Sequence, residues 1–336
     1  MISSPVRLEL PTDFAVGSVN AYLFTGPEPV LVDCGVRSEA GWAAIQAGLA
    51  DCGVAVSDLA RVVITHAHVD HYGLAAKIAA HSDAEIWVSE LGVPWLVDSD
   101  AMWEKRIGYY QDEFLPHIGL PSAVIETTVQ FMWFASRTAD SVLPGRIVTF
   151  PLDATLEMGG LPWQVIYTPG HASHQTCFYQ PDTRQFLSAD MLLVKAPTPV
   201  VERPTSDTKR TPGLPQFLDS LSLVESLSID DVYPGHGKPF RDHLAVIKQQ
   251  RARILRRKLE CLAWVQKGVD TIGALVQKMY GGQPDVLHVA GLWMLVGYLD
   301  LLLADGLIRE RSVDGNAHFE PVNGRHSSGS LWLRSL

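Results

Sequence analysis

Short apolar runs alternate with helical patterns in two separate parts of this 336-residue chain, and this alternation limits the fold more than any other feature. Residues 6–33 contain three runs typical of strands, and strand patterns return between residues 151 and 234. Segments with helical spacing lie between and after these strands. Strands and helices that alternate in this way form layered structures in which helices cover sheets. We therefore predict an α/β fold built from two halves of the chain.

Composition excludes several other classes of protein. Hydrophobic residues make up 47% of the chain, charged residues make up 19%, and the formal net charge of −10 argues against a surface built as a whole for nucleic acid. The four cysteines are scattered, which favours reduced thiols over disulfides. The amino terminus has no apolar run suited to a signal peptide, and two aspartates interrupt the most hydrophobic stretch, residues 289–307. We expect a cytoplasmic protein that does not enter a membrane.

Two further segments differ from the alternating core. Eight of the chain's 29 aromatic residues lie between positions 95 and 134, and we predict a helical insertion over roughly residues 91–150. Its aromatic side chains either form a small core of their own or line an apolar pocket. Three helical patterns and a final pair of strands predict a winged-helix-like module over residues 241–322. The catalytic core is expected to span residues 1–240 and a poorly ordered tail residues 323–336.

A dense cluster of histidines follows one of the apolar runs. The stretch VVITHAHVDHYGL, residues 62–74, contains an HxHxDH pattern. A strand that ends in a tight loop can turn His66 and His68 toward one point. Asp70 and His71, at the start of the next helix, can face a second point nearby. Because neutral imidazole and carboxylate are ligands that suit divalent zinc, iron and manganese, the pattern predicts a metal site.

Four ligands do not complete two metal positions, so more histidines and a bridging acid are expected downstream. YTPGHASH places His171 in a glycine loop after a strand pattern, and FLSADML ends a strand with Asp190. VYPGHG presents His236 between two glycines. Functional residues of α/β enzymes collect where strand ends lead into loops. The occurrence of all three in this order extends the predicted metal site.

The order HxHxDH, GH, strand-end Asp and GHG resembles the metallo-β-lactamase superfamily over roughly residues 6–240. The resemblance implies an αββα sandwich with a two-metal site at one edge. Its glyoxalase II-like and β-lactamase-like protein 2-like members show the same motif order, and the latter also have a winged-helix-like tail. The ligands implied are three for the first metal, three for the second and one that bridges them: His66, His68 and His171; Asp70, His71 and His236; and Asp190.

The resemblance also suggests roles outside the ligand set. Asp33, in the VLVDCG strand, is expected to hydrogen-bond to a ligand and to orient it. For His174, a structural or supporting place beside the ligands is favoured. Residues predicted to touch the substrate come from the insertion and from the stretch after Asp190: Tyr109, Tyr110, Trp133 and Lys195.

Two bound metal ions, with zinc expected and iron or manganese as alternatives, indicate the type of reaction. Metal coordination lowers the pKa of water from about 15.7 to about 7 and stabilises negative charge on a carbonyl or phosphoryl oxygen. We predict a dinuclear metallohydrolase in which a metal-bridging hydroxide attacks the substrate. Asp70 would be the catalytic carboxylate that orients the hydroxide and helps to move protons.

The substrate is less constrained than the reaction. The aromatic insertion favours a small carboxylic ester, lactone or thioester, which predicts an esterase, lactonase or thioesterase with a small-molecule substrate. The stretch MLLVKAPTPVVE after Asp190 lacks the Gly-rich, Lys-Phe-Phe loop of glyoxalase II, which argues against glutathione thioesters. A homodimer formed through the insertion or the tail is left open.

The alternative is a metal-dependent nuclease or phosphodiesterase that acts on RNA. Residues 241–258 contain seven Arg or Lys against one Asp, which could form a phosphate-binding face. A solvated helix with a buried stripe that includes Leu244, Ile247 and Ile254 explains the same pattern. We favour this second explanation, so binding of nucleic acid is the less favoured alternative.

Overall fold

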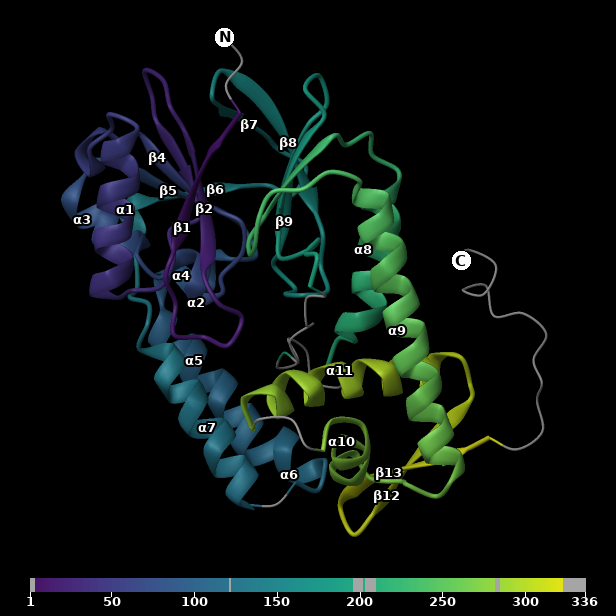
Figure 1. Ribbon diagram of the computed structural model, residues 1–336. Helices are drawn as coiled ribbons and strands as arrows, with labels where there is room; N and C mark the ends of the chain where they lie inside the picture. Colours follow the sequence, from purple (N-terminus) through teal and green to yellow (C-terminus); the bar gives the residue numbers. More distant parts are fainter. Residues whose placement is uncertain (1–3, 121, 196–201, 203–209, 282–284, 323–336) are drawn as a thin grey trace.

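Two β-sheets packed face to face form the centre of the protein (Figure 1). The computed structural model describes residues 4–120, 122–195, 202, 210–281 and 285–322. The first sheet has six strands in sequence order: β1 (Val6–Leu10), β2 (Val19–Phe24), β3 (Val30–Val32), β4 (Arg61–Ile64), β5 (Glu85–Ser89) and β6 (Ile147–Phe150). The second sheet has the order β11-β10-β9-β8-β7: β7 (Thr155–Met158), β8 (Leu161–Tyr167), β9 (Thr176–Gln180), β10 (Gln185–Ala189) and β11 (Asp231–Pro234).

Parallel strand pairs in each sheet determine where the functional residues meet. Strands β3 to β6 run parallel to one another, and β10 runs parallel to β11. The strands β3 and β4 read as continuous apolar runs because they are buried on both faces. Since the carboxyl ends of parallel strands lie at the same edge of a sheet, the residues that follow these strands are brought together.

Aromatic side chains fill the space between the two sheets. Phe24 of the first sheet and Trp163 of the second meet edge to face, with ring centroids 5.3 Å apart. Trp163 is fully buried, and its indole N–H donates to the Met158 carbonyl at 3.1 Å. Because this polar group has a partner, the large ring can be buried without an unsatisfied donor.

Helices cover the outer faces of both sheets, which gives the predicted αββα order of layers. On the first sheet lie α1 (Glu39–Asp51), the short α2 (Val69–Tyr72) and α3 (Ala75–His81), with a 3₁₀ turn, η1 (Val56–Asp58). On the second sheet lies α8 (Gly213–Glu225) (Figure 1). The Ser38 side chain accepts the Gly41 N–H at 2.9 Å, which fixes the start of α1. The αββα fold predicted from the sequence is confirmed.

The aromatic segment between β5 and β6 is helical, as expected. It consists of α4 (Val93–Val97), α5 (Ser99–Gly108), a π-helical segment η2 (Tyr109–Phe114), α6 (Leu115–His117), α7 (Ser122–Ser136) and a 3₁₀ turn, η3 (Pro144–Arg146). The sequence placed its end near residue 150, but residues 147–150 form β6, which pairs with β5. Only Phe150 of this strand is fully buried, so its apolar pattern is a weak signal.

Three helices and a hairpin follow the core in the predicted order: α9 (His243–Gln266), α10 (Ile272–Tyr280), α11 (Asp285–Ala304), β12 (Ile308–Val313) and β13 (Asn316–Pro321). Asp314 and Gly315 turn the hairpin with φ values of 50° and 83°, as a two-residue turn of this kind requires. Among the described helices, none combines the length and the hydropathy that a membrane span needs. The expected tail, residues 323–336, lies outside the described residues.

The insertion and the carboxyl-terminal helices lie side by side below the sheets in Figure 1. The Trp293 indole N–H of α11 donates to the Tyr110 hydroxyl at 2.7 Å, and His117 Nδ1 lies 3.0 Å from the Gly315 carbonyl oxygen. Arg210 pairs with Asp300 of α11 at 2.7 Å. Segments almost 200 positions apart in the sequence therefore form one continuous structure.

Candidate metal centre

Seven side chains converge at the edge where the central strands end. They form three groups in which one nitrogen or oxygen of each residue lies within 4.8 Å of the others. The residues come from the segments that follow β4, β8, β10 and β11, with Asp70 and His71 in the short helix α2 after β4. The three groups are His66, His68 and His171; His66, His71 and Asp190; and Asp70, His71 and His236. The structure thus brings together all seven residues that the sequence motifs named.

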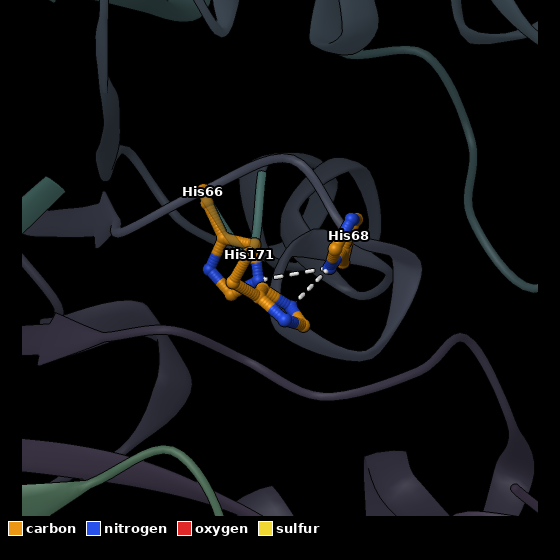
Figure 2. A group of neighbouring side chains, drawn as sticks. All are labelled: His66, His68 and His171. Atoms are coloured by element: carbon orange, nitrogen blue, oxygen red, sulfur yellow. Dashed lines mark hydrogen bonds between the residues drawn. The ribbon is translucent and has the colours of Figure 1, made fainter. Parts of the chain in front are cut away.

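The first group consists of three imidazole rings that point at one another (Figure 2). His68 Nδ1 lies 3.1 Å from His66 Nε2 and 2.9 Å from His171 Nε2. A tetrahedral ion with metal–nitrogen bonds of about 2.0–2.1 Å separates its ligand nitrogens by about 3.3 Å. The three ring nitrogens therefore have nearly the spacing that one such ion requires.

The second group contains a carboxylate and two histidines. His236 Nε2 lies 3.3 Å from Asp70 Oδ2, and His71 Nε2 lies 4.0 Å from the same oxygen. The Asp190 carboxylate lies between the two groups: its Oδ2 is 3.5 Å from His171 Nε2 and 3.4 Å from His236 Nε2. Asp190 is therefore placed where a ligand shared by two ions would lie.

Buried polar atoms without partners test whether a cation fits here. Within the described residues, His71 Nε2 and Asp190 Oδ1 are buried and have no hydrogen-bond partner. A buried carboxylate oxygen without a donor is costly, and native proteins rarely leave one unsatisfied. Because both atoms face the same centre, divalent cations with nitrogen and oxygen ligands fit the residues present.

Hydrogen bonds to the other ring nitrogens fix how three of the histidines point. His71 Nδ1 lies 2.8 Å from Asp33 Oδ2, and His236 Nδ1 lies 2.8 Å from the Ser18 carbonyl oxygen. His66 Nδ1 lies 3.0 Å from Thr65 Oγ1. When Nδ1 is engaged in this way, the Nε2 lone pair is directed to the centre.

The local backbone explains why glycine and strained residues occur at the site. A Cβ atom at Gly235 would lie 2.2 Å from Asp190 Oδ1 and 2.9 Å from His71 Cε1, so a side chain there would displace a ligand. Asp33 and Ala189, at the ends of β3 and β10, have φ values of 59° and 43°. Such values are strained for residues other than glycine and tend to occur at functional sites.

The first group is electrostatically suited to bind a cation. Burial lowers the pKa of His66 and His68 well below the usual value, and the charges of neighbouring histidines lower it further. Burial also lowers the pKa of His171. These rings are therefore neutral at pH 7, which is the form of histidine that binds metal.

In the second group, nearby carboxylates raise the pKa of the histidines instead of leaving it lowered. Although burial acts to lower the pKa of His236, Asp190 and Asp70 raise it to about 10. In the same way, the charges of Asp33 and Asp190 raise the pKa of His71 well above its usual value, against the effect of burial. A metal ion that binds here replaces protons on these rings, so binding should release protons.

The remaining predicted residues lie outside the three groups. His174 is buried, and its Nδ1 accepts the Ala67 N–H at 3.2 Å, which suits a supporting place beside His66. Tyr109 and Tyr110 are buried against Phe114 within the insertion. Trp133 on α7 is 40% exposed, and Lys195 is also exposed. Contact of these four residues with a substrate remains a prediction.

Sequence reasoning missed two groups that orient the ligands. The Ser18 carbonyl is a backbone atom, so no residue type marks it in the sequence. Thr65 donates its N–H and its hydroxyl to Asp33, at 2.9 and 2.8 Å. Its position directly before the HxHxDH pattern was the available signal.

A two-sheet sandwich with a histidine and aspartate centre at one edge defines the class of metallo-hydrolase-like α/β proteins. The sequence profile described as metallo-beta-lactamase superfamily matches residues 15–236. The chain belongs to this superfamily.

Relatives match along most of the chain. A Bacillus subtilis (strain 168) protein described as probable metallo-hydrolase YqjP is 26% identical over 94% of this chain and 98% of its own length. An Aspergillus fumigatus protein described as atrochrysone carboxyl ACP thioesterase is 21% identical over 82% of this chain and 72% of its own. The crystal structure of a beta-lactamase domain protein from Burkholderia ambifaria has a TM-score of 0.79 and 22% identity, and covers 94% of this chain and 92% of its own. That structure supports the fold alone.

Proposed function

We propose that this protein is a metal-dependent hydrolase of small carboxylic esters, lactones or thioesters, with two divalent ions, zinc first among the candidates. The proposal depends on one observation: the Asp190 carboxylate lies 3.5 Å from His171 of the first group and 3.4 Å from His236 of the second, and its buried Oδ1 has no partner among the described residues. The thioesterase description of the Aspergillus fumigatus relative favours a carbonyl substrate.

Asp70 is the residue we assign to proton transfer. Divalent ions in such a centre make water acidic near neutral pH and stabilise negative charge on a carbonyl oxygen. Although burial acts to raise the pKa of Asp70, the charges of His71 and His236 lower it below its usual value. The carboxylate is therefore ionised at neutral pH, and can accept a hydrogen bond from water and orient it for attack.

The charges of α9 weigh against the alternative of an RNA-cleaving enzyme. Four of the seven basic residues of segment 241–258, which comprises the start of α9 and the two residues before it, pair with acids of this chain: Arg241 with Asp231, Arg251 with Glu225, Arg257 with Glu260, and Lys258 with Asp305. The other three, Lys248, Arg253 and Arg256, are exposed. Because most of the positive charge is already neutralised, α9 is a weak phosphate-binding face.

A substrate panel with metal control tests the proposal. Purified protein is stripped with a chelator, reloaded with zinc, iron or manganese, and assayed on p-nitrophenyl esters, acyl-homoserine lactones, S-lactoylglutathione, bis-p-nitrophenyl phosphate and single-stranded RNA. We expect hydrolysis of at least one carbonyl substrate, loss with the chelator and recovery with metal. Asp190→Ala should lower kcat/KM at least about 10³-fold, because both ligand groups lose a shared ligand. Efficient cleavage of RNA or the phosphodiester, with every carbonyl substrate ignored, would overturn the proposal.

A further inference from the structure

One buried arginine of the insertion has no anionic partner among the residues that the structure describes. Arg106, in α5, is 8% exposed, and its guanidinium carbon lies 5.5 Å from the ring centroid of Trp95 and 5.6 Å from that of Trp103. With the residues that the structure describes, Arg106 forms no hydrogen bond and no ion pair. The two rings meet edge to face with centroids 5.9 Å apart, so the guanidinium lies against a pair of tryptophans, and no carboxylate of the described residues pairs with it.

Ring contacts connect Arg106 to the metal centre. Burial lowers the pKa of His68 and of His174, and the positive charge of Arg106 lowers both further. The Trp95 ring connects them: its centroid is 6.1 Å from that of His174, which is 6.0 Å from that of His68. The Nε2 atom of His68 is also buried without a partner among the described residues.

An acid that also acts on His174 does not neutralise Arg106. The charge of Glu202 raises the pKa of His174, whereas that of Arg106 lowers it. Its Oε1 accepts the Ser173 N–H at 2.9 Å, and it forms no ion pair with Arg106. Arg106 is the one arginine among the leading causes of the pKa shifts of His68 and His174.

Such an arrangement suits an anionic ligand. No Arg106 nitrogen is among the fully buried atoms that lack a partner, so the N–H groups can be reached by a ligand. A guanidinium whose N–H groups are free matches a carboxylate with two parallel hydrogen bonds, while the two rings hold it by cation–π contacts. One cation suits a singly charged carboxylate better than a phosphate dianion.

We propose that Arg106 binds a carboxylate of the substrate while the bond to be cut lies at the metal centre. The substrates are then esters, lactones or thioesters whose acyl part carries a second, free carboxyl group, as in monoesters of dicarboxylic acids. Arg106 is the residue that selects these over neutral acyl groups. This inference rests on the proposed hydrolase function.

Matched ester pairs test the selection. Mono-p-nitrophenyl glutarate and p-nitrophenyl valerate have acyl chains of equal length and differ in the free carboxylate. In Arg106→Met the ratio of kcat/KM for the charged ester over the neutral one should fall at least about 30-fold, mainly through KM. Arg106→Lys keeps the charge but not the planar fork, so its ratio should fall less, about 5- to 10-fold. The exposed Arg253→Met is the matched control and should leave the ratio unchanged.

Binding of glutarate separates failure of this inference from failure of the proposed function. Calorimetry on zinc-loaded protein needs no turnover; wild type should bind glutarate at least 10-fold more tightly than Arg106→Met, at equal metal content and melting temperature. If wild type cuts only phosphodiesters but this difference persists, the hydrolase proposal fails and the carboxylate site stands. The inference is wrong if wild type, Arg106→Met and Arg106→Lys have the same kcat/KM ratio for the two esters and the same affinity for glutarate. Arg106 then only packs against Trp95 and Trp103.

Discussion

Asp33 shows how one residue outside the ligand set controls the centre. Its carboxylate is buried and contacts the His71 ring at 2.8 Å, while the N–H and hydroxyl of Thr65 occupy both of its oxygens. A carboxylate fixed by two donors accepts the ring N–H of His71 at Nδ1, so the proton that a metal ion would replace is the one on Nε2, which faces the centre. The tautomer of His71 therefore depends on Asp33.

Replacement of Asp33 by asparagine should weaken the second metal position. In Asp33→Asn an amide N–H₂ can face the ring N–H of His71, so the ring either loses its hydrogen bond or carries its proton on Nε2. We expect a 10- to 100-fold loss of metal affinity at one of two positions. Competition titration with a chromophoric chelator, together with elemental analysis, measures this loss. The exposed Asp182→Asn is the control, and equal affinities in both variants would show that Asp33 serves the fold alone.

Single residues also mark the limit of what the sequence can predict. The seven clustered residues could be predicted because each lies shortly after the end of a strand, within a short motif of histidine, aspartate and glycine. Arg106 could not, because the sequence does not say whether a charged side chain finds a partner once the chain has folded. Pairing of charges is a tertiary property, and so is the burial that makes an unpaired charge informative.

Among the elements, α9 contains one residue whose predicted burial is wrong. The predicted buried stripe included Leu244, but Leu244 is 49% exposed. The Asp242 side chain accepts the Ala245 N–H at 3.0 Å, so the helix begins at His243. From there His243, Val246 and Ile247 face the core, and Leu244 lies about 100° away around the helix. Ile247 and Ile254 were predicted correctly because they lie on the buried face.

The buried His243 gives α9 a dependence of stability on pH. Burial lowers the pKa of His243 below 6.5, although contacts with the backbone of Leu227 and Ile229 act in the opposite direction. The unfolded chain therefore binds a proton more readily, and the contribution of neutral His243 is present above about pH 6.5 and lost as the pH falls below it. We expect wild type to lose more stability between pH 7 and pH 5 than His243→Gln does.

Urea unfolding of both proteins at several pH values measures this difference. Metal ligands titrate equally in the two proteins, so their effect cancels in the comparison. The exposed His81→Gln is the control and should follow wild type. Parallel curves for wild type and His243→Gln would show that His243 is not the group that titrates.

At the scale of the whole molecule, the sequence predicted the parts but not how they meet. The insertion and the carboxyl-terminal helices each had a recognisable pattern, yet nothing in either pattern indicates that α11 contacts η2. One apolar core extends from the first sheet through the insertion to these helices, including Ile64, Tyr110 and Leu295. The insertion that carries Arg106 is therefore held from two sides.

Coupling between Tyr110 and Trp293 tests whether these parts act as one unit. The Trp293 N–H donates to the Tyr110 hydroxyl at 2.7 Å, in a partly buried setting. Tyr110 has further interactions, so the single variant Tyr110→Phe does not isolate this bond, whereas a double-mutant cycle with Trp293→Phe does. We expect a coupling free energy of about 1 kcal/mol, measured by urea unfolding. The cycle of Tyr110→Phe with Trp87→Phe, a tryptophan of β5 that donates to Glu85, should be additive. A coupling near zero in the first cycle would mean that the carboxyl-terminal helices only lie against the insertion, and that Arg106 is positioned by the insertion alone.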